Sequence, residues 1–392
     1  MKIASRYATI EFTCTYSEAM AKIDTAASCE VDPKTVAQLA RLRYVNDAIP
    51  GIGRIPTRSG FRYVDSEGKP MHDQATLARI KALAIPPAWR DVWICPSDNG
   101  HVQATGRDAK GRKQYRYHRR WRTVRDELKY DRMIQFGRAL PTIRRHVHDA
   151  MSLPGIPREK ALATVVFLLQ QTMMRIGNEE YARANRSFGL TTLRNRHVRI
   201  EGASIEFAFT GKSGVRHQVK LQDPRLARIV KRLRELPGQD LFQYVDDEGE
   251  LRAINSADVN DYLRALADED YTAKDFRTWF GTVLAAQALL DLERHGSATR
   301  IKKNITCAIK AVAERLGNTP AICRKCYVHP LVLEAYQDGT LHEILRRYRD
   351  KKPVRDPHAL RPEEAGLLAL LKRQEKQRAE RRRGRVFHDI PA

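Results

Sequence analysis

The amino-terminal third of the chain alternates short extended segments with one helical segment. Residues 60–71, GFRYVDSEGKPM, show a strand, a Ser-Glu-Gly turn and a second extended piece. Residues 73–85 have apolar side chains at helical spacing, and the two prolines that follow should end this helix. Asn99-Gly100 is typical of a hairpin turn between further short strands. These patterns predict a small domain of strands and helices.

The rest of the chain is dominated by helical periodicity. Apolar residues from Leu162 to Met173 form a broad face on a helix that begins near Pro157. Apolar and polar residues alternate on both sides of TGKSG, residues 210–214, which predicts a β-hairpin with this segment at its tip. Further elements are expected as helices at 223–236, 256–267, 273–294 and 299–316, and as a small strand pair around 246–249. The fold class is therefore α+β, with a small mixed amino-terminal domain and a mostly α-helical domain that contains an inserted β-hairpin patch.

The charge balance indicates a polyanionic partner. The 392 residues include 70 Lys and Arg against 47 Asp and Glu, a formal net charge of +23. Nucleic acid is the first candidate, because basic side chains that neutralise phosphates supply most sequence-independent affinity, and an anionic membrane is the second. No apolar run approaches the roughly 20 residues of a spanning helix, and the chain starts without a hydrophobic signal segment. We therefore expect a soluble, cytoplasmic protein that does not bind membranes.

Gly211-Lys212-Ser213 resembles the end of a nucleotide-binding Walker A loop, but the surrounding residues argue against that function. Such a loop needs another glycine five positions before Gly211, where this chain has Glu206. It also opens a helix, whereas an alternating strand pattern follows Gly214. Lys212 is therefore expected at the tip of a hairpin, where a lysine is usually a solvated turn residue.

Two arginines stand at predicted helix ends. Arg175 follows the long apolar helix in MMRIGNEEY, and Arg277 lies near the start of a helix on which Thr272 and Asp275 predict a capping box. Lys274 adds a second positive charge in the first turn, which is unfavourable at the positive end of a helix dipole unless an anion binds there. Taken alone, each arginine is explained as well by an exposed position or a salt bridge.

The segment LGNTPAICRKCYVHP, residues 316–330, places a tyrosine at the end of a short helix. Gly317 is expected to end the preceding helix, and Thr319-Pro320 is a favourable start for the next one. Tyr327 then lies in the last turn. Taken alone, Asn318 is explained as a helix cap and Tyr327 as a half-buried helix residue.

The order of these residues resembles that of the type IB DNA topoisomerases, in the compact form found in bacteria and poxviruses. The resemblance runs from about Arg41 to Tyr348 and includes IPPAWRDVWICPSDNGHVQATGRDAKGRKQYRYH, residues 85–118. It implies a clamp of two domains around duplex DNA, with Tyr327 as the nucleophile that forms a 3′-phosphotyrosyl bond while the free 5′ end rotates before religation. The other catalytic residues that it implies are Arg175, Lys212, Arg277 and Asn318. Asn318 stands where poxvirus and nuclear members have His.

Phosphoryl transfer explains why these residue types would be needed. Two guanidiniums can clamp the phosphate, and the side-chain N–H of Asn318 can donate to a non-bridging oxygen. Lys212 would protonate the leaving 5′ oxygen, and Tyr327 must lose its proton to attack. Because the tyrosyl ester conserves the energy of the phosphodiester, no ATP and no metal cofactor are expected. Cys323 and Cys326 have the spacing of half a zinc site, but no second ligand pair accompanies them, and we expect free thiols.

A DNA-facing surface is expected between residues 103 and 121, where basic and aromatic residues interleave. With Lys274 of the helical domain, the expected DNA contacts are Gln103, Arg107, Lys110, Arg112, Lys113, Tyr115, Arg116 and Tyr117. A solvated basic hairpin is the plainer alternative for the segment.

These inferences divide the chain into an extension (1–38), a DNA-binding clamp domain (39–125), a catalytic domain (126–350) and a basic tail (351–392). The expected protein is a monomer that acts on double-stranded DNA in a bacterial nucleoid.

Two other functions are open on the sequence. A tyrosine recombinase uses the same transesterification chemistry, although its second arginine usually follows a His-x-x-Arg pattern, where this chain has Lys274-x-x-Arg277. A non-catalytic DNA-binding protein would account for the positive charge alone. Relaxation of supercoiled DNA without ATP or metal separates these possibilities.

Overall fold

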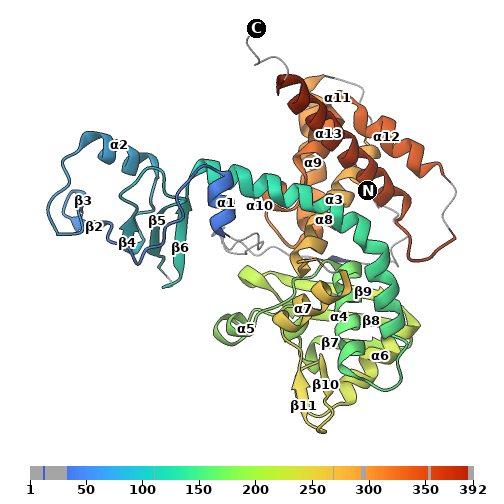
Figure 1. Ribbon diagram of the computed structural model, residues 1–392. Coiled ribbons are helices and arrows are strands. Elements are labelled where there is room, and N and C mark those ends of the chain that lie inside the picture. Colours follow the sequence, from blue (N-terminus) through green and yellow to red (C-terminus); the bar gives the residue numbers. More distant parts are fainter. Residues whose placement is uncertain are drawn as a thin grey trace. The chain divides into compact units, whose positions relative to one another are not determined.

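The computed structural model describes residues 12–13, 33–109, 111–267, 269–292, 297–351 and 355–386. These residues form two compact units (Figure 1): an amino-terminal unit within Lys22–Arg132, and a carboxy-terminal unit of Phe12–Thr13 and the described residues from Met133 onward. Helix α3, Arg119–Ala150, contains the division between the two units. No helix among the described residues is long and apolar enough to cross a membrane.

The amino-terminal unit is built on an antiparallel sheet with the strand order β3-β2-β4-β5-β6. Its strands are β2 (Ile52–Thr57), β3 (Gly60–Val64), β4 (Arg90–Ile94), β5 (Val102–Arg107) and β6 (Lys113–Tyr117). Helix α2, Gln74–Ala82, starts at Asp73, whose carboxylate accepts the Thr76 N–H at 2.8 Å, and buries Ile80 in the core formed with the sheet. The expected small domain of strands and helices is confirmed.

A second apolar cluster in this unit includes a short helix that begins at Pro33. Helix α1, Pro33–Leu39, buries Val36 and Ala37 in a cluster with Trp121 of α3. Residues 33–38, which the sequence places in an extension, therefore contribute a helix to a packed core. The remaining residues of that expected extension lie outside the described residues, apart from Phe12–Thr13.

The carboxy-terminal unit is mostly helical and is organised around α8, Ala273–Leu290, which packs against α4, α9, α11, α12 and α13. The other helices are α4 (Arg158–Thr172), α5 (Glu179–Asn185), α6 (Pro224–Glu235), α7 (Ser256–Ala267), α9 (Ala298–Leu316), α10 (Pro320–Cys326), α11 (Pro330–Asp338), α12 (Thr340–Arg349) and α13 (Pro362–Val386). Phe276 and Trp279 of α8 pack edge-on against Phe136 of α3, with ring centroids 5.0 and 6.2 Å apart. The helices expected from the sequence are confirmed, and so is the α+β class.

The inserted β patch is an antiparallel sheet with the order β1-β9-β8-β7. Strands β8 (Ser204–Thr210) and β9 (Arg216–Gln222) form the expected hairpin, flanked by β7 (Val198–Glu201) and by the two-residue strand β1 (Phe12–Thr13). The short pair β10 (Gln243–Val245) and β11 (Leu251–Ala253) surrounds the expected turn at 246–249.

Part of the expected basic tail is a packed helix. The first half of α13 buries Leu367, Leu368, Leu370 and Leu371, and α13 packs against α12 and α8. Glu364 at its start is buried and accepts two hydrogen bonds from Arg144 of α3, at 2.9 and 2.6 Å. The helix therefore belongs to the core of the carboxy-terminal unit, at least as far as Leu371.

Candidate active site

Helix α8 carries Arg277 into the interior of the carboxy-terminal unit, where this side chain is only 4% exposed. Its Nη2 donates to the carbonyl of Leu316 at 2.9 Å, and its Nη1 donates to the carbonyl of Met173. Leu316 ends α9, and Met173 is the C-cap of α4, so the guanidinium lies at the negative ends of two helix dipoles. These contacts offset the unfavourable charge that the sequence places near the start of α8. The Nε atom of Arg277 is buried with no hydrogen-bond partner among the described residues.

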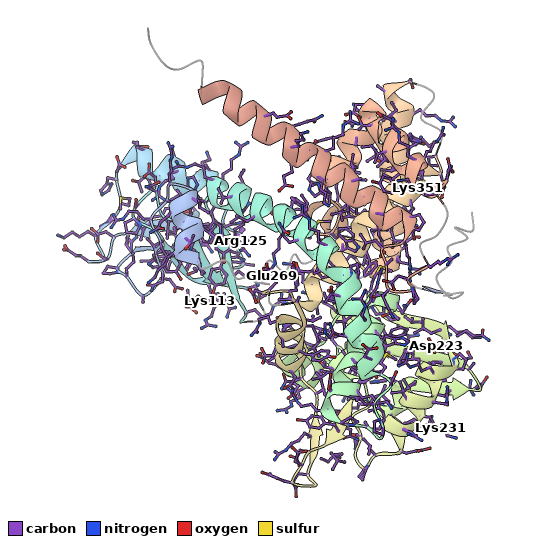
Figure 2. All side chains as sticks on the ribbon, turned by 45° about the vertical axis from the view of Figure 1, so that its right-hand side comes forward. Lys113, Arg125, Asp223, Lys231, Glu269 and Lys351 are labelled. Atoms are coloured by element: carbon purple, nitrogen blue, oxygen red, sulfur yellow. The ribbon has the colours of Figure 1, made fainter. Side chains whose placement is uncertain are left out.

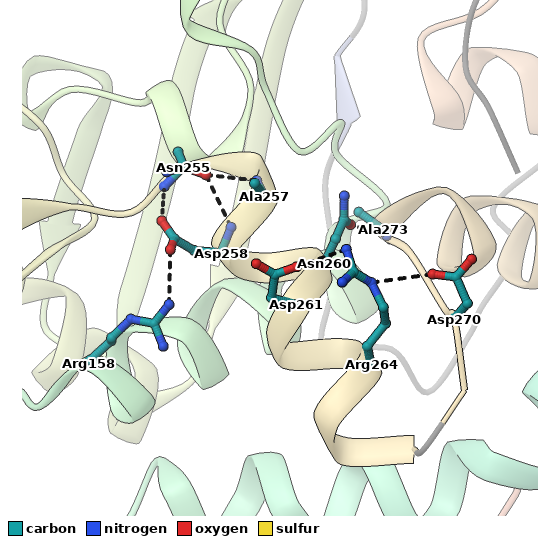
Figure 3. Close-up of polar contacts among 9 residues, drawn as sticks. All are labelled: Arg158, Asn255, Ala257, Asp258, Asn260, Asp261, Arg264, Asp270 and Ala273. Atoms are coloured by element: carbon teal, nitrogen blue, oxygen red, sulfur yellow. Dashed lines mark hydrogen bonds and ion pairs between the residues drawn. The ribbon is translucent and has the colours of Figure 1, made fainter. Parts of the chain in front are cut away.

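The start of α8 is fixed by its own cap and by α7. Asp275 accepts the N–H of Thr272 at 2.8 Å and its hydroxyl at 2.9 Å, which confirms the expected capping box. Asn260 of α7 accepts the Ala273 N–H at 3.1 Å (Figure 3). Helix α7 is in turn tied to α4, because Asp258 accepts from Arg158 at 2.9 Å (Figure 3).

Arg175 contacts the turn that joins α9 to α10. It lies in the extended segment after α4, and its Nη2 donates to the Gly317 carbonyl at 3.2 Å and to Oδ1 of Asn318. Gly317 is the left-handed C-cap of α9, with φ 59°, as expected from the sequence. A guanidinium can only donate, so the amide oxygen of Asn318 must face Arg175 and its NH₂ group points elsewhere. That Nδ2 atom is buried with no hydrogen-bond partner among the described residues.

Tyr327 is the C-cap of α10 and lies half-buried beneath Arg277, whose Cζ is 5.0 Å from the ring centroid. Its backbone rests on α8. The Thr282 hydroxyl is 3.1 Å from the Tyr327 carbonyl oxygen and accepts the His329 N–H at 3.1 Å. A Cβ atom on Gly281 would come within 3.0 Å of the Tyr327 carbonyl oxygen. One helix therefore provides both the cation above the phenol ring and the surface that supports the tyrosine backbone.

The phenol of Tyr327 is acidified by this environment. Burial by itself raises the pKa of Tyr327, but the charges of Arg277, Arg175 and Lys274 more than compensate, and the pKa lies below the usual value of 10.0. The phenolate, which is the nucleophilic form of tyrosine, is therefore favoured here more than in water.

Lys212 lies in the turn that joins β8 to β9. This turn is a single 3₁₀ segment, Lys212–Gly214, closed by a hydrogen bond of 2.7 Å from the Gly211 N–H to the Val215 carbonyl. No helix follows it, which agrees with the rejection of a nucleotide-binding loop. The Lys212 side chain is exposed.

The structure brings Arg175, Asn318, Arg277 and Tyr327 of the expected catalytic residues into direct or electrostatic contact. Arg175 touches Asn318, Arg277 lies over Tyr327, and both arginines lower the pKa of the phenol. Lys212 is on a neighbouring turn whose Gly211 packs against the ring of His217, and this ring also packs against Gly317.

Three residues of this region, Gly281, Thr282 and His217, are missed by the sequence analysis. The sequence offers a signal for Gly281 alone, whose spacing of four residues from Arg277 places both on one side of α8, whereas Thr282 lies about 140° round the helix from Arg277. Nothing in the alternation of β9 distinguishes His217 from an ordinary strand residue.

The expected DNA-facing residues lie on the β5–β6 hairpin, within the amino-terminal unit. Tyr115 and Tyr117 stack with centroids 5.7 Å apart. Three basic side chains have partners in the same unit: Arg112 pairs with Asp108, Lys113 (Figure 2) with Asp47, and Arg107 with Asp91. Arg116 donates to the Ala84 carbonyl at 2.8 Å. Lys110 lies outside the described residues.

Gln103 differs from this expectation. Its side chain is 3% exposed, its Nε2 donates to backbone carbonyls that include Gly100 at 2.8 Å, and its Oε1 accepts from Arg79 at 2.7 Å. The amide is fully used inside the unit, so Gln103 braces the turn between β4 and β5 and is withdrawn from the DNA-facing set. Alternation along a strand does not reveal such a buried polar residue.

Comparisons with known proteins give one consistent family. The sequence profile of the eukaryotic DNA topoisomerase I catalytic core matches residues 118–352, and that of the bacterial DNA topoisomerase IB N-terminal domain matches residues 60–108. The chain is 32% identical over 311 residues to the DNA topoisomerase 1B of Acanthamoeba polyphaga mimivirus, covering 78% of this chain and 92% of that one. It is 26% identical over 305 residues to the DNA topoisomerase 1 of rabbit fibroma virus, covering 75% and 92%, and 25% identical over 246 residues to the DNA topoisomerase 1B of vaccinia virus strain Copenhagen, covering 62% and 74%.

Proposed function

The chain belongs to the type IB DNA topoisomerase family, and we propose that it relaxes supercoiled duplex DNA by cutting and resealing one strand through Tyr327. In this mechanism the Tyr327 phenolate attacks a backbone phosphorus, the bond to the 5′ oxygen breaks, and a 3′-phosphotyrosyl ester forms. The freed strand rotates, and its 5′ hydroxyl then attacks the ester and releases the tyrosine. The number of phosphoester bonds is conserved, so no ATP is consumed.

The observation that carries this proposal is the position of Tyr327 beneath a buried arginine, with its pKa lowered by Arg277 and Arg175. A buried tyrosine with no chemical task ordinarily has a raised pKa, because burial disfavours the phenolate. Two buried donors have no hydrogen-bond partner among the described residues: Nε of Arg277, the residue above the phenol ring, and Nδ2 of Asn318, which contacts Arg175 through its Oδ1. Both are suited to donate to the non-bridging oxygens of a phosphate group.

We assign the remaining roles from chemistry. Arg175 and Arg277 balance the charge that develops on the phosphoryl group, and Asn318 adds a hydrogen bond from its NH₂ group. Lys212 protonates the leaving 5′ oxygen, since an alkoxide is a poor leaving group and the adjacent exposed turn can enter a DNA groove. Asn318 cannot transfer a proton, so its contribution is limited to binding and orientation.

The proposed partner is double-stranded DNA, bound by a monomer in the bacterial nucleoid. The basic and aromatic side chains of the β5–β6 hairpin, with Lys274 near the start of α8, are proposed to contact the DNA. Because phosphate contacts release counterions, binding should weaken steeply as salt is raised.

The test is relaxation of a supercoiled plasmid in EDTA and without ATP. We expect topoisomers that differ by single linking numbers, and a covalent protein–DNA adduct when the reaction is stopped with detergent. Tyr327→Phe should abolish both and retain salt-sensitive DNA binding. Tyr262→Phe is the matched control, because this α7 hydroxyl has no hydrogen-bond partner among the described residues, and it should relax DNA normally.

Three results would contradict the proposal. They are failure of the wild-type protein to relax the plasmid, relaxation by Tyr327→Phe, and strand exchange between two duplexes in place of relaxation. The last result would identify a recombinase, whereas DNA binding with no adduct would identify a non-catalytic DNA-binding protein.

A further inference from the structure

We propose that His217 is a positioning residue that couples the Lys212 turn to the turn carrying Asn318. It rests on the function proposed above, and it concerns a residue that neither transfers a proton nor contacts the phosphate. The ring of His217 is a spacer of fixed thickness between two backbone turns, each of which presents one catalytic side chain.

The packing of the ring between two glycines is the first observation. A Cβ atom on Gly211 would lie 2.6 Å from Cδ2 of His217, and a Cβ atom on Gly317 would lie 2.4 Å from Cε1. Both distances are far below van der Waals contact. Cδ2 and Cε1 flank Nε2 on either side, so the tip of the ring lies against both backbones and leaves no room for a side chain at either glycine.

The identity of the neighbours is the second observation. Gly211 immediately precedes Lys212, and Gly317 immediately precedes Asn318. The Gly317 carbonyl also accepts a hydrogen bond from Arg175 at 3.2 Å. A displacement of the ring would therefore move Lys212, the proposed proton donor, on one side. On the other side it would move Asn318 and Arg175, the proposed phosphate ligands.

The ring itself is held by the hairpin. His217 on β9 is paired directly with Phe209 on β8, and the two rings stack with centroids 5.1 Å apart and an interplanar angle of 16°. Phe209 is 8% exposed and belongs to the core. The core thus fixes one face of the imidazole, which lets the ring edges set the separation of the two turns.

The electrostatic surroundings suit a neutral spacer. Burial lowers the pKa of His217 to about 4, and the nearby charges of Arg175 and Arg277 lower it in the same direction. At neutral pH the ring therefore adds no positive charge beside the two guanidiniums. A lysine or arginine here would repel both.

The first experiment is single-turnover cleavage of a short duplex by His217→Ala, with DNA affinity and melting temperature measured on the same sample. Since a misplacement of about 1 Å can cost about 100-fold in rate, we expect cleavage to slow by about 10- to 100-fold. DNA affinity should change less than about threefold, because His217 makes no phosphate contact in the proposed mechanism. Unchanged cleavage, or equal losses of cleavage and affinity, would overturn the proposal.

His197 supplies a matched control. It is another largely buried histidine of the same unit, its ring lies 4.5 Å from that of Phe188, and burial lowers its pKa as well. His197→Ala should lower the melting temperature and leave the cleavage rate of the folded enzyme within about threefold of wild type. If His197→Ala loses as much cleavage as His217→Ala, the loss reflects the general stability of the unit, and this result would also overturn the proposal.

Two double-mutant cycles then test the coupling itself. Gly211→Ala should impair cleavage by pushing on the ring, and this effect should largely vanish in a His217→Ala background, where the space is open. His217→Ala should likewise cost much less in a Lys212→Ala background than in wild type, because the group that it positions is already missing. Additive losses in both cycles would refute the coupling.

A second substitution covers the possibility that His217→Ala does not fold. His217→Gln keeps a neutral planar group of similar reach, so it should cleave faster than His217→Ala. If His217→Ala is unfolded, the cleavage rate of His217→Gln should lie within about tenfold of wild type, at unchanged DNA affinity. A folded His217→Gln with cleavage as low as that of Lys212→Ala would contradict a spacer role. If wild-type protein forms no Tyr327 adduct, the proposed function fails; if it does and His217→Ala cleaves normally, only this inference fails.

Discussion

Thr282→Val should show how much the support of the Tyr327 backbone contributes to cleavage, because it leaves the phenol of Tyr327 itself unchanged. The Thr282 side chain is completely buried. Its hydroxyl lies 2.8 Å from the Thr278 carbonyl and 3.1 Å from the Tyr327 carbonyl, and it accepts the His329 N–H at 3.1 Å. A hydroxyl has one proton, so it donates to one of the carbonyls at a time and accepts from the amide.

Valine keeps the shape of threonine and removes both hydrogen bonds. At a net value of about 0.5–1.5 kcal/mol for each bond, the expected loss of stability is about 1–3 kcal/mol. Release of the Tyr327 backbone by a few tenths of an ångström should slow cleavage by about three- to tenfold, since about 1 Å costs about 100-fold. Urea unfolding measures the first quantity and single-turnover cleavage the second.

Thr282→Ser is the matched control. It retains the hydroxyl and loses a buried methyl group worth about 0.8 kcal/mol, so its stability should fall slightly and its cleavage rate should stay near that of wild type. The reasoning is refuted if Thr282→Val cleaves as fast as wild type, or if Thr282→Ser slows cleavage as much as Thr282→Val does.

Three further predictions concern the same unit. Gly281→Ala gains helix propensity of about 1 kcal/mol but places its Cβ 3.0 Å from the Tyr327 carbonyl oxygen. We therefore expect a melting temperature near that of wild type and single-turnover cleavage that is several-fold slower. Unimpaired cleavage would show that the contact relaxes freely. Arg144→Met leaves the Glu364 carboxylate buried without its cationic partner, with the Arg361 N–H still donating to it at 2.8 Å, and should lower the unfolding free energy in urea by about 3–5 kcal/mol. Much of this loss should return in Arg144→Met/Glu364→Leu, and no recovery in the double variant would contradict the reasoning. Because the charge of Lys274 helps to depress the pKa of Tyr327, Lys274→Gln should move the rising limb of the cleavage rate to higher pH, and a limb that stays in place would exclude this effect.

The elements that the sequence predicts well are those specified by neighbouring residues. The capping box of Thr272 and Asp275, the left-handed stop at Gly317 and the β8–β9 hairpin depend on interactions within a few residues, or on a period of two. The proposed catalytic residues also came from the sequence, because their order along the chain resembles that of a known family, and their roles stay a prediction.

The environment of each site residue could not be predicted in the same way. Arg277 donates hydrogen bonds to carbonyls 104 and 39 residues away in the sequence. No local sequence pattern predicts that two helix ends lie beside its guanidinium. Gln103 alternates along its strand as an exposed residue would, but the turn before it folds back and uses its amide. The role of α13 was equally hidden, because four leucines that pack on the core directly precede a run of charges.

In the proposed mechanism, the position of Arg277 at the ends of α4 and α9 makes strand cleavage depend on an intact fold. The guanidinium whose charge lowers the pKa of Tyr327 is held by hydrogen bonds to the carbonyls at the ends of these two helices, so fraying of either helix end loosens it from above the phenol ring. The pKa of the phenol then rises, because Arg277 makes the largest of the contributions that lower it. In the proposed mechanism, a partly unfolded molecule therefore keeps the positive charge that attracts DNA but loses the activated nucleophile that cleaves it. In the proposed mechanism, strand cleavage is therefore confined to molecules in which the ends of α4 and α9 are intact.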